Sequence, residues 1–352
     1  MNCAVVNLPT DFEIHMEEID TQTVEVPKPT ERVGIYHADC FDGVAAAWVL
    51  LQQYPDIRLI AADYRDPVPT DLVGADVYIV DFSYTRQQLL ELTIDCASVT
   101  LIDHHPRALE FRDWVHNLSS EDREVCSDYG YDLSRLMIFV DKNRSGAQLT
   151  WDYFHPHTGS REVCRHQIQI ERVDCDCFPK GEPRPFWLDA VGQRDLWIFN
   201  SDVIKPLCYA LGTLPLDPRI WQREFNRYEN AGELHQHQMV IGRAIESKVQ
   251  QDVERILSQT KRSIVLTDGT DYYDVPLLNV PRFLASEALD AIAEGHPFVA
   301  GYYDDGECRV FSLRSNKQSG IDTRPISRFY GGDGHDHASG FRIARSESLA
   351  QH

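Results

Sequence analysis

Histidine and aspartate residues recur in this sequence at points where short apolar runs end. They are His37, Asp39, Asp42, Asp81, Asp103, His104, His105 and Asp195. A single aspartate after a strand is more often a turn or helix-cap residue than a ligand. Such residues at several strand ends instead indicate one shared site, because the carboxyl ends of parallel strands meet at one edge of a sheet. We therefore interpret the set as a candidate catalytic site.

These residue types are the ones that a pair of divalent cations requires. Two ions about 3.5 to 4 Å apart need a bridging carboxylate, several oxygen ligands and a few imidazoles from different loops. We expect Asp81 to be the bridge. The first ion would take His37 and Asp39, and the second would take Asp42, His104 and Asp195. A hydroxide held between the ions would attack phosphorus without a separate general base, since metal binding lowers the pKa of water toward about 7.

The elements that must position these residues alternate between strands and helices. Residues 33–36, 57–61, 77–80 and 99–102 are short runs rich in valine and isoleucine, typical of buried strands. Residues 44–53 are apolar all round, which suits a helix packed on a sheet. This alternation predicts an α/β fold with a doubly wound parallel sheet in its N-terminal domain, whose functional residues gather at the carboxyl ends of the strands.

The remaining pattern predicts how the chain is divided. We expect an N-terminal extension at 1–30, a metal-binding catalytic domain at 31–215 with an insertion at 106–185, a connector at 216–260 and a substrate-binding domain at 261–345. Apolar residues recur at helical spacing between 241 and 256, so the connector should contain a long helix. Runs at 263–267, 275–279, 298–303 and 308–313 indicate strands, with a helix at 287–293. The last domain should therefore be small and mixed α/β.

Charge and cysteine usage limit the class of protein. Lysine and arginine number 34 against 55 acidic residues, a net charge of −21. Such a surface repels a long polyanion, which favours short or small substrates over tracking along a duplex. The nine cysteines lack a repeated pair spacing and are interpreted as reduced thiols. A zinc site at Cys175 and Cys177 stays as an alternative, although the usual two-residue spacer is missing.

The distribution of apolar residues also bears on membrane insertion and export. No run approaches the roughly 18 apolar residues of a membrane span. The N-terminus has no basic region followed by an apolar run. We therefore expect a cytoplasmic protein with no membrane partner.

Six motifs resemble those of the DHH phosphoesterases and occur in the order of that family. IDHH at 102–105 resembles the signature, HADCFDG at 37–43 the first motif, VYIVDFS at 77–83 the second and RDLW at 194–197 the fourth. SGAQLTW at 145–151 and YGGDGHDHASGF at 330–341 resemble a family segment and the glycine-histidine motif of the DHH-associated C-terminal domain. They cover most of residues 31–343, and the resemblance is to the RecJ-like and oligoribonuclease-like members.

The resemblance implies a role for each matching residue. It implies metal ligands at His37, Asp39, Asp42, Asp81, His104 and Asp195, catalytic roles for Asp81, Asp103, His104 and His105, and substrate binding by His105, Arg314, Ser315, Gly331, Gly332, Gly334 and His335. Asp103 would orient His104, while His105 would face the scissile phosphate. The glycine loop and His335 would hold a phosphate. Arg314 would grip a phosphate or stack on a base.

Two positions depart from the family pattern. The first motif usually separates its two aspartates by one residue, but Asp39 and Asp42 have two residues between them, and Cys40 stands where the first aspartate would be expected. One metal site is therefore expected to bind its ion differently, or the loop to shift its register. The second departure is Asp333, an acid where the glycine-rich loop often has glycine. It would oppose phosphate binding unless its side chain points away.

The resemblance implies a metal-dependent phosphodiesterase of the exonuclease or oligoribonuclease type. Its cofactors would be two divalent ions, Mn²⁺ first and Mg²⁺ or Co²⁺ as alternatives. Its partner would be a short single-stranded oligonucleotide or a small nucleotide, and a homodimer is left open. Cyclic-dinucleotide or bisphosphonucleotide phosphodiesterase is the near alternative. From a different class, the chain could be a catalytically silent scaffold that binds nucleic acid. A pyrophosphatase fits less well, because the glycine-histidine motif resembles the nucleic-acid branch.

Overall fold

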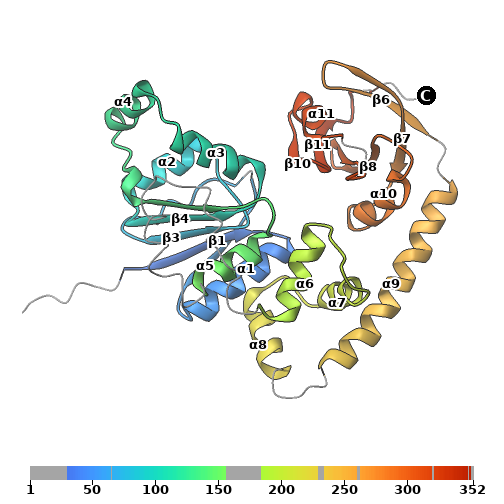
Figure 1. Ribbon diagram of the computed structural model, residues 1–352, viewed down its shortest axis with the longest axis horizontal. Coiled ribbons are helices and arrows are strands. Elements are labelled where there is room, and N and C mark those ends of the chain that lie inside the picture. Colours follow the sequence, from blue (N-terminus) through green and yellow to red (C-terminus); the bar gives the residue numbers. More distant parts are fainter. Residues whose placement is uncertain are drawn as a thin grey trace, which may run out of the picture.

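Two β-sheets, each accompanied by helices, make up the protein (Figure 1). The computed structural model describes residues 30–64, 66–155, 184–228, 234–259, 262–318, 321–347 and 349. The predicted extension at 1–30, apart from its last residue, and the cysteine pair at 175 and 177 lie outside the described residues. We call residues 30–228 the N-terminal part and residues 262–349 the C-terminal part. The predicted mixed α/β class is confirmed.

The N-terminal sheet has the strand order β2-β1-β3-β4-β5, with every pairing parallel. Its strands are β1 (Arg32–His37), β2 (Arg58–Ala62), β3 (Asp76–Val80), β4 (Ser98–Asp103) and β5 (Leu136–Val140). Four of them match predicted strands. The edge strand β5 lies in the segment predicted as an insertion, where no strand was expected. The chain leaves β1 toward opposite sides to form β2 and β3, and parallel sheets place ligand sites at such a switch point.

Helices cover both faces of this sheet (Figure 1). One face carries α1 (Phe41–Gln53), α5 (Gly146–Phe154), α6 (Phe186–Asp195), α7 (Ile204–Leu211) and α8 (Pro218–Tyr228), and the other carries α2 (Arg86–Asp95) and α3 (Pro106–His116), followed by α4 (Ser120–Asp128) and a 3-10 turn, η1 (Leu133–Arg135). Residues Val44 to Leu51 of α1 are all buried, as its apolar sequence predicted. Because helices cover both faces of the sheet, the carboxyl ends of its strands are where a ligand site can form.

The C-terminal part contains a mixed sheet of order β10-β11-β9-β8-β7-β6. Its elements are β6 (Ser263–Thr267), β7 (Asp271–Asn279), η3 (Arg282–Leu284), α10 (Ala285–Ala293), β8 (Val299–Asp305), β9 (Cys308–Arg314), α11 (Arg324–Phe329), β10 (Asp333–His335) and β11 (Ala338–Ala344). Only the pairing of β7 with β8 is parallel. The four predicted strands and the helix are confirmed, while β10 and β11 were not foreseen.

A long helix, α9 (Leu234–Gln259), leads from α8 toward the C-terminal sheet (Figure 1). It packs closely on α7 because Gly242 has no side chain at the crossing, where a Cβ would overlap the Pro206 carbonyl. No helix of the described residues combines the length and the apolar character that crossing a bilayer requires. Helix α9 joins the two parts along one side (Figure 1). Residues of both parts line a cleft between them.

Candidate metal centre and substrate cleft

The predicted ligands come from the carboxyl ends of three strands and the end of one helix. His37 is the last residue of β1, Asp81 follows β3, His104 follows β4 and Asp195 ends α6, while Asp39 and Asp42 come from the loop after β1 and the first turn of α1. The strands are neighbours in the sheet, so their ends converge. The structure thus brings together residues that are up to 158 positions apart in the chain.

Asp81 lies at the centre of this cluster, and its side chain is 1 % exposed. Its Oδ2 is 3.5 Å from His37 Nδ1 and 3.5 Å from Cys40 Sγ. Its Oδ1 is 3.2 Å from His104 Nε2, which in turn lies 3.4 Å from Asp195 Oδ2. The backbone of Asp81 has φ of 57°, a left-handed conformation that costs about 1 to 3 kcal/mol for a residue with a side chain. Such strain is typical of functional sites.

Four groups of possible ligands occur here among the described residues; two combine His104 and His105 with His335 or with Asp81 and Asp103, and the other two correspond to the expected ion positions. One consists of His37, Cys40 and Asp81, and the other of Asp42, His104 and Asp195; within each group the ligand atoms lie within 4.8 Å of one another. The second group is the one that the sequence predicted. In the first, Cys40 lies where Asp39 was expected. Asp39 is exposed, has φ of 52°, and belongs to none of the ligand groups found among the described residues.

Several buried atoms of this cluster have no hydrogen-bond partner among the described residues. They are His37 Nδ1, Asp81 Oδ1, Asp103 Oδ2, and both Nδ1 and Nε2 of His104. Leaving a buried polar atom unpaired costs free energy, so native proteins rarely do it without a reason. Carboxylate oxygens and imidazole nitrogens are also the usual ligands of divalent transition metals. The donor set therefore fits metal ions.

Burial and neighbouring charges shift the pKa values of the residues in this cluster. Burial, followed by the charges of Asp81 and Asp195, raises the pKa of Asp42 well above its usual value. Burial alone would also raise the pKa of Asp81, but contacts with the His104 and His37 rings hold that pKa well below its usual value. Burial opposes the charge on His104, yet Asp195 and Asp81 raise the pKa of His104 to about 9. Asp42 and His104 therefore hold protons in the metal-free protein, and a cation that binds here would displace them.

The segment 145–147 supports two of the carboxylates. Ser145 Oγ donates to Asp42 Oδ1 at 2.7 Å, and the Ala147 backbone N–H donates to Asp42 Oδ2 at 3.2 Å. Gly146 lies between them, and a Cβ at that position would be 2.6 Å from Asp81 Oδ1. This arrangement explains why the family-like motif SGA stands at the start of α5: it orients Asp42 and leaves room for Asp81.

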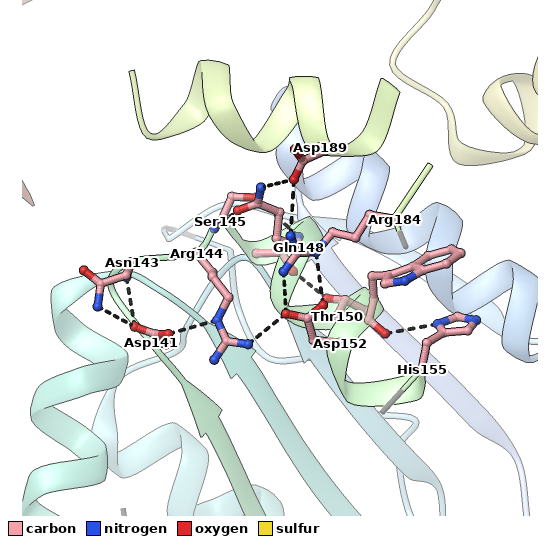
Figure 2. Close-up of polar contacts among 12 residues, drawn as sticks. Asp141, Asn143, Arg144, Ser145, Gln148, Thr150, Asp152, His155, Arg184 and Asp189 are labelled. Carbon is pink, nitrogen blue, oxygen red and sulfur yellow. Dashed lines mark hydrogen bonds and ion pairs between the residues drawn. The ribbon is translucent and has the colours of Figure 1, made fainter. Parts of the chain in front are cut away.

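A polar network anchors the start of α5 (Figure 2). Gln148 Nε2 donates to Asp189 Oδ1 of α6 at 2.7 Å. Arg144 and Arg184 both donate to Asp152 Oδ2, at 2.8 and 2.6 Å. The side chain of Asp152 is 2 % exposed, and the two guanidinium groups are its buried ion-pair partners. The network fixes α5 relative to α6, which carries Asp195.

Asp103 holds the ring of the second histidine in the IDHH motif. Its buried Oδ1 is 2.7 Å from His105 Nδ1 and accepts from the backbone N–H groups of His104 at 2.7 Å and His105 at 3.2 Å. We expected Asp103 to orient the His104 ring, but Asp103 contacts His104 only through the His104 backbone N–H. The ring that it orients is that of His105.

His335 of β10 approaches the cluster from the C-terminal part. Its ring centroid is 4.8 Å from that of His105 and 5.0 Å from that of His104. Burial, with the nearby His105 and His104, holds the pKa of His335 well below its usual value, so the ring is neutral. The structure therefore places His335 opposite the predicted metal ligands.

The glycine loop before His335 is shaped by close packing. At Gly332 a Cβ would overlap the Gly340 carbonyl oxygen, and at Gly334 it would be 2.6 Å from the Ala338 carbonyl oxygen. Both glycines therefore let β10 approach β11. Asp333 turns toward Arg328, which donates to its Oδ1 at 3.1 Å. The carboxylate that departs from the family pattern is thus neutralised by a neighbouring arginine.

Arg314 and Ser315, the other predicted substrate contacts, line the same cleft. Arg314 donates to Ser286 Oγ at 3.1 Å and to the Leu313 carbonyl at 2.9 Å. Burial lowers the pKa of Arg314, and no carboxylate contacts its guanidinium among the described residues. Ser315 Oγ donates to the Ile321 carbonyl at 2.7 Å, so its hydroxyl supports the loop. Arg314 is therefore the better candidate for binding an anion.

The cleft between the two parts has a volume of about 2670 Å³. Ligand pockets for small molecules typically measure about 300 to 1,000 Å³, so this cleft has room for more than one nucleotide. Its walls include Phe283, Lys142 and Lys317, which the sequence analysis did not single out. Phe283 is 79 % exposed, a feature that only the fold reveals.

Comparisons with known proteins give little beyond the fold. No family model and no curated protein matches the chain. Among solved structures, a pGpG-specific phosphodiesterase, PggH from Vibrio cholerae, aligns with a TM-score of 0.43 and 13% identity over 90% of this chain and 94% of that one. An uncharacterized protein from Helicobacter pylori aligns with a TM-score of 0.30 and 15% identity over 91% and 95%. At these TM-scores neither similarity bears on activity, so any functional conclusion depends on the geometry of the cluster and cleft.

Proposed function

We propose that this chain is a metal-dependent phosphodiesterase of the DHH type that hydrolyses short oligonucleotides or small nucleotides. The observation that carries the proposal is the environment of Asp81. This carboxylate is buried between His37 Nδ1 and His104 Nε2, at 3.5 and 3.2 Å, and neither of these two nitrogens makes a hydrogen bond among the described residues. Two cations that shared this carboxylate would give His37 Nδ1 and His104 Nε2 the partners that they lack.

The ligands divide around this shared carboxylate. His37 and Asp81 would hold one ion, and Asp42, His104 and Asp195 would hold the other with Asp81. Carboxylates mixed with imidazoles favour Mn²⁺, with Mg²⁺ and Co²⁺ as alternatives. When bound, the two ions would polarise the phosphoryl group and lower the pKa of water toward about 7.

The other residues would position the substrate. Because Asp103 holds Nδ1 of His105, the remaining ring nitrogen of His105 is available for a phosphate oxygen. His335 is neutral and would offer a hydrogen bond to the substrate across the cleft. The guanidinium of Arg314 would offer positive charge and paired N–H donors to a phosphate. We assign metal binding to a domain at 31–215 and substrate binding to a domain at 261–345, joined by the connector at 216–260.

The size and charge of the protein support a short substrate. A cleft of about 2670 Å³ accommodates a dinucleotide, and the net charge of −21 disfavours long nucleic acids. Linear dinucleotides, bisphosphonucleotides, cyclic dinucleotides and longer single strands should therefore be compared at equal manganese. We expect manganese-dependent hydrolysis that is fastest for a linear dinucleotide or short strand.

A matched pair of variants tests the metal centre. Asp81→Asn should abolish hydrolysis and leave the circular dichroism spectrum unchanged, since Asn is isosteric but cannot bridge two cations as an anion. Asp128→Asn, an exposed carboxylate of α4, should retain full activity. Intact substrates under all metal conditions would favour the silent scaffold, and full activity in Asp81→Asn would exclude the proposed role of that residue.

A further inference from the structure

The residue at position 40 takes a place that the sequence pattern gives to an aspartate. In HADCFDG, Asp39 should be the second ligand of the first ion. Its backbone instead adopts φ of 52° and the residue is exposed, outside the ligand groups found in the described residues. The side chain that reaches the bridging carboxylate is Cys40, whose Sγ lies 3.5 Å from Asp81 Oδ2.

Three possible ligand atoms, Asp81 Oδ2, His37 Nδ1 and Cys40 Sγ, have spacings that suit a metal site. This oxygen is 3.5 Å from both His37 Nδ1 and Cys40 Sγ. Ligand bonds of about 2.0 to 2.3 Å in a tetrahedral site place ligand atoms roughly 3.3 to 3.8 Å apart. The observed distances therefore fit a cation bound by one oxygen, one nitrogen and one sulfur.

Cys40 Sγ contacts Asp81 Oδ2, but other polar atoms of the same two ligand residues, His37 and Asp81, make no hydrogen bond among the described residues. Asp81 is 1 % exposed and its Oδ1 accepts no hydrogen bond among the described residues, and His37 Nδ1 is also unpartnered. Cys40 precedes α1 at the N-cap, where serine, threonine, aspartate and asparagine are preferred, yet its side chain makes no capping hydrogen bond. Its side chain points instead to the cluster, so helix capping does not explain the cysteine.

We propose that Cys40 is a thiolate ligand of the first ion, together with His37 and Asp81. The inference rests on the metal centre of the proposed function and specifies its chemistry. The thiol proton leaves to solvent when the ion binds, as for other cysteine ligands. Asp42, His104 and Asp195 supply only oxygen and nitrogen, so the two positions differ in softness.

This difference determines which ions the centre prefers. A thiolate favours Zn²⁺, Co²⁺ and Cd²⁺ over Mn²⁺ and Mg²⁺. The first position should therefore select a thiophilic ion, while the second accepts a harder one. An aspartate at position 40 would remove this selectivity. The Cys40→Asp variant thus separates the identity of the ligand from the presence of the metal.

Cobalt provides a readout that does not depend on activity, because a thiolate bound to Co²⁺ gives a charge-transfer absorption band in the near ultraviolet. The full chain should carry Cys175→Ser and Cys177→Ser, which removes a closely spaced thiol pair that would compete for cobalt. In this parent, Co²⁺ titration should produce the band, and Cys40→Ser and Cys40→Asp should lose it. Cys308→Ser, in β9, should retain it. Circular dichroism should confirm that each variant is folded.

Calorimetry should separate metal binding from sulfur ligation. We expect Cys40→Asp to bind metal still, with its preference for Mn²⁺ over Cd²⁺ increased about tenfold or more. Two results would overturn the inference: the parent binds cobalt without producing the band, or the band persists in Cys40→Ser. In either case, manganese-dependent hydrolysis by the parent would show that the proposed function still stands. A parent that binds no divalent ion would overturn both.

Discussion

Ser145 Oγ donates a 2.7 Å hydrogen bond to Asp42 Oδ1 across 103 positions of the chain. The same oxygen of Ser145 accepts from the Gln148 backbone N–H at 3.3 Å, which caps α5. One hydroxyl therefore starts a helix and orients a proposed metal ligand. The pairing couples the local stability of α5 to the geometry of the metal centre.

Ser145→Ala should weaken both properties. Loss of the cap should lower the free energy of unfolding by about 0.5 to 2 kcal/mol. Asp42 would lose its shortest hydrogen bond in a buried position, and losing such a supporting contact typically lowers metal affinity about 10- to 100-fold. Chemical denaturation and manganese titration by calorimetry measure the two effects separately.

Ser119→Ala is the matched control for this prediction. Ser119 caps α4 with the same reciprocal arrangement, accepting from the Asp122 backbone N–H at 3.0 Å, but it is exposed and does not line the cleft. It should lose stability within the same range without a change in manganese affinity. Equal manganese affinity in Ser145→Ala and the wild type would show that Ser145 does not support the proposed metal centre.

Gly146→Ala tests the space beside the bridging carboxylate. Alanine normally stabilises a helix relative to glycine by about 1 kcal/mol. Here the new Cβ would be 2.6 Å from Asp81 Oδ1, so the carboxylate must move and manganese affinity should fall about tenfold or more. Gly130→Ala, at an exposed position with φ of 73°, controls for backbone strain and should keep wild-type affinity. A more stable Gly146→Ala protein with normal affinity would refute the contact.

The sequence predicted the sheet and the convergence of the proposed ligands because both follow from local patterns. The apolar runs at 77–80 and 99–102 match β3 and β4, and the parallel order then brings Asp81 and His104 to one edge. Strand β5 was missed because its apolar run, 136–140, is flanked by polar segments that resemble an insertion, and all five of its residues are only partly buried.

Side-chain direction could not be predicted in the same way. Spacing placed Asp39 and Cys40 in one loop, but the left-handed backbone at Asp39 decides which side chain enters the cluster. Likewise, the partner of Asp103 depends on the rotamers of two adjacent histidines. Contacts between distant segments, such as Ser145 with Asp42, have no signal in a single sequence.

His335→Ala should chiefly impair substrate binding. Its ring faces His104 and His105 at 5.0 and 4.8 Å, but the proposed metal positions are complete without it. Losing a hydrogen bond to a charged phosphate costs about 1.5 to 3 kcal/mol, so KM should rise about 10- to 100-fold while manganese affinity is unchanged. His296→Ala, outside the cleft, is the control. An unchanged KM would remove His335 from substrate binding, and a loss of manganese affinity would make it a metal ligand.

Metal affinity should increase with pH. In the metal-free protein the pKa of Asp42 is raised and that of His104 reaches about 9, so both groups must release protons to bind a cation. Apparent manganese affinity should therefore rise between pH 6 and 9, by up to about tenfold per pH unit for each proton released. Calorimetry in buffers of different ionisation enthalpy counts these protons. A manganese affinity that does not change with pH would contradict the proposal that Asp42 and His104 are protonated in the metal-free protein.

The stability of the metal-free protein should change in the opposite direction. The pKa of His104 is raised from 6.5 to about 9 by folding, so its protonated form stabilises the folded state fully below pH 6.5. That contribution is lost as the pH rises through about 9. Thermal unfolding should therefore show a lower Tm at pH 9.5 than at pH 6.5, and saturating manganese should reduce the difference. A Tm that rises over this range without metal would refute the assignment.

Arg194 and Glu287 join helix α6, which carries the proposed ligand Asp195, to α10 of the C-terminal part. Arg194 Nη2 and Tyr209 OH both donate to Glu287 Oε1 at 3.0 Å, and the Glu287 side chain is 9 % exposed. Replacing one partner of a buried ion pair typically costs about 3 to 5 kcal/mol because the other charge stays unpaired. Arg194→Met should approach this cost, reduced by the hydrogen bond that Tyr209 keeps.

A double-mutant cycle distinguishes this pair from ordinary surface charges. Arg194→Met with Glu287→Leu should be less destabilised than Arg194→Met alone, because the double variant buries no uncompensated charge. Arg309 and Asp304, a bidentate pair with side chains 25 % and 32 % exposed, provide the comparison, and their coupling should be about 0.2 to 1 kcal/mol. Similar coupling energies for the two pairs would show that Arg194 and Glu287 do not hold the parts together. A larger coupling at Arg194, with lower turnover in the single variants, would link closure of the cleft to the position of Asp195.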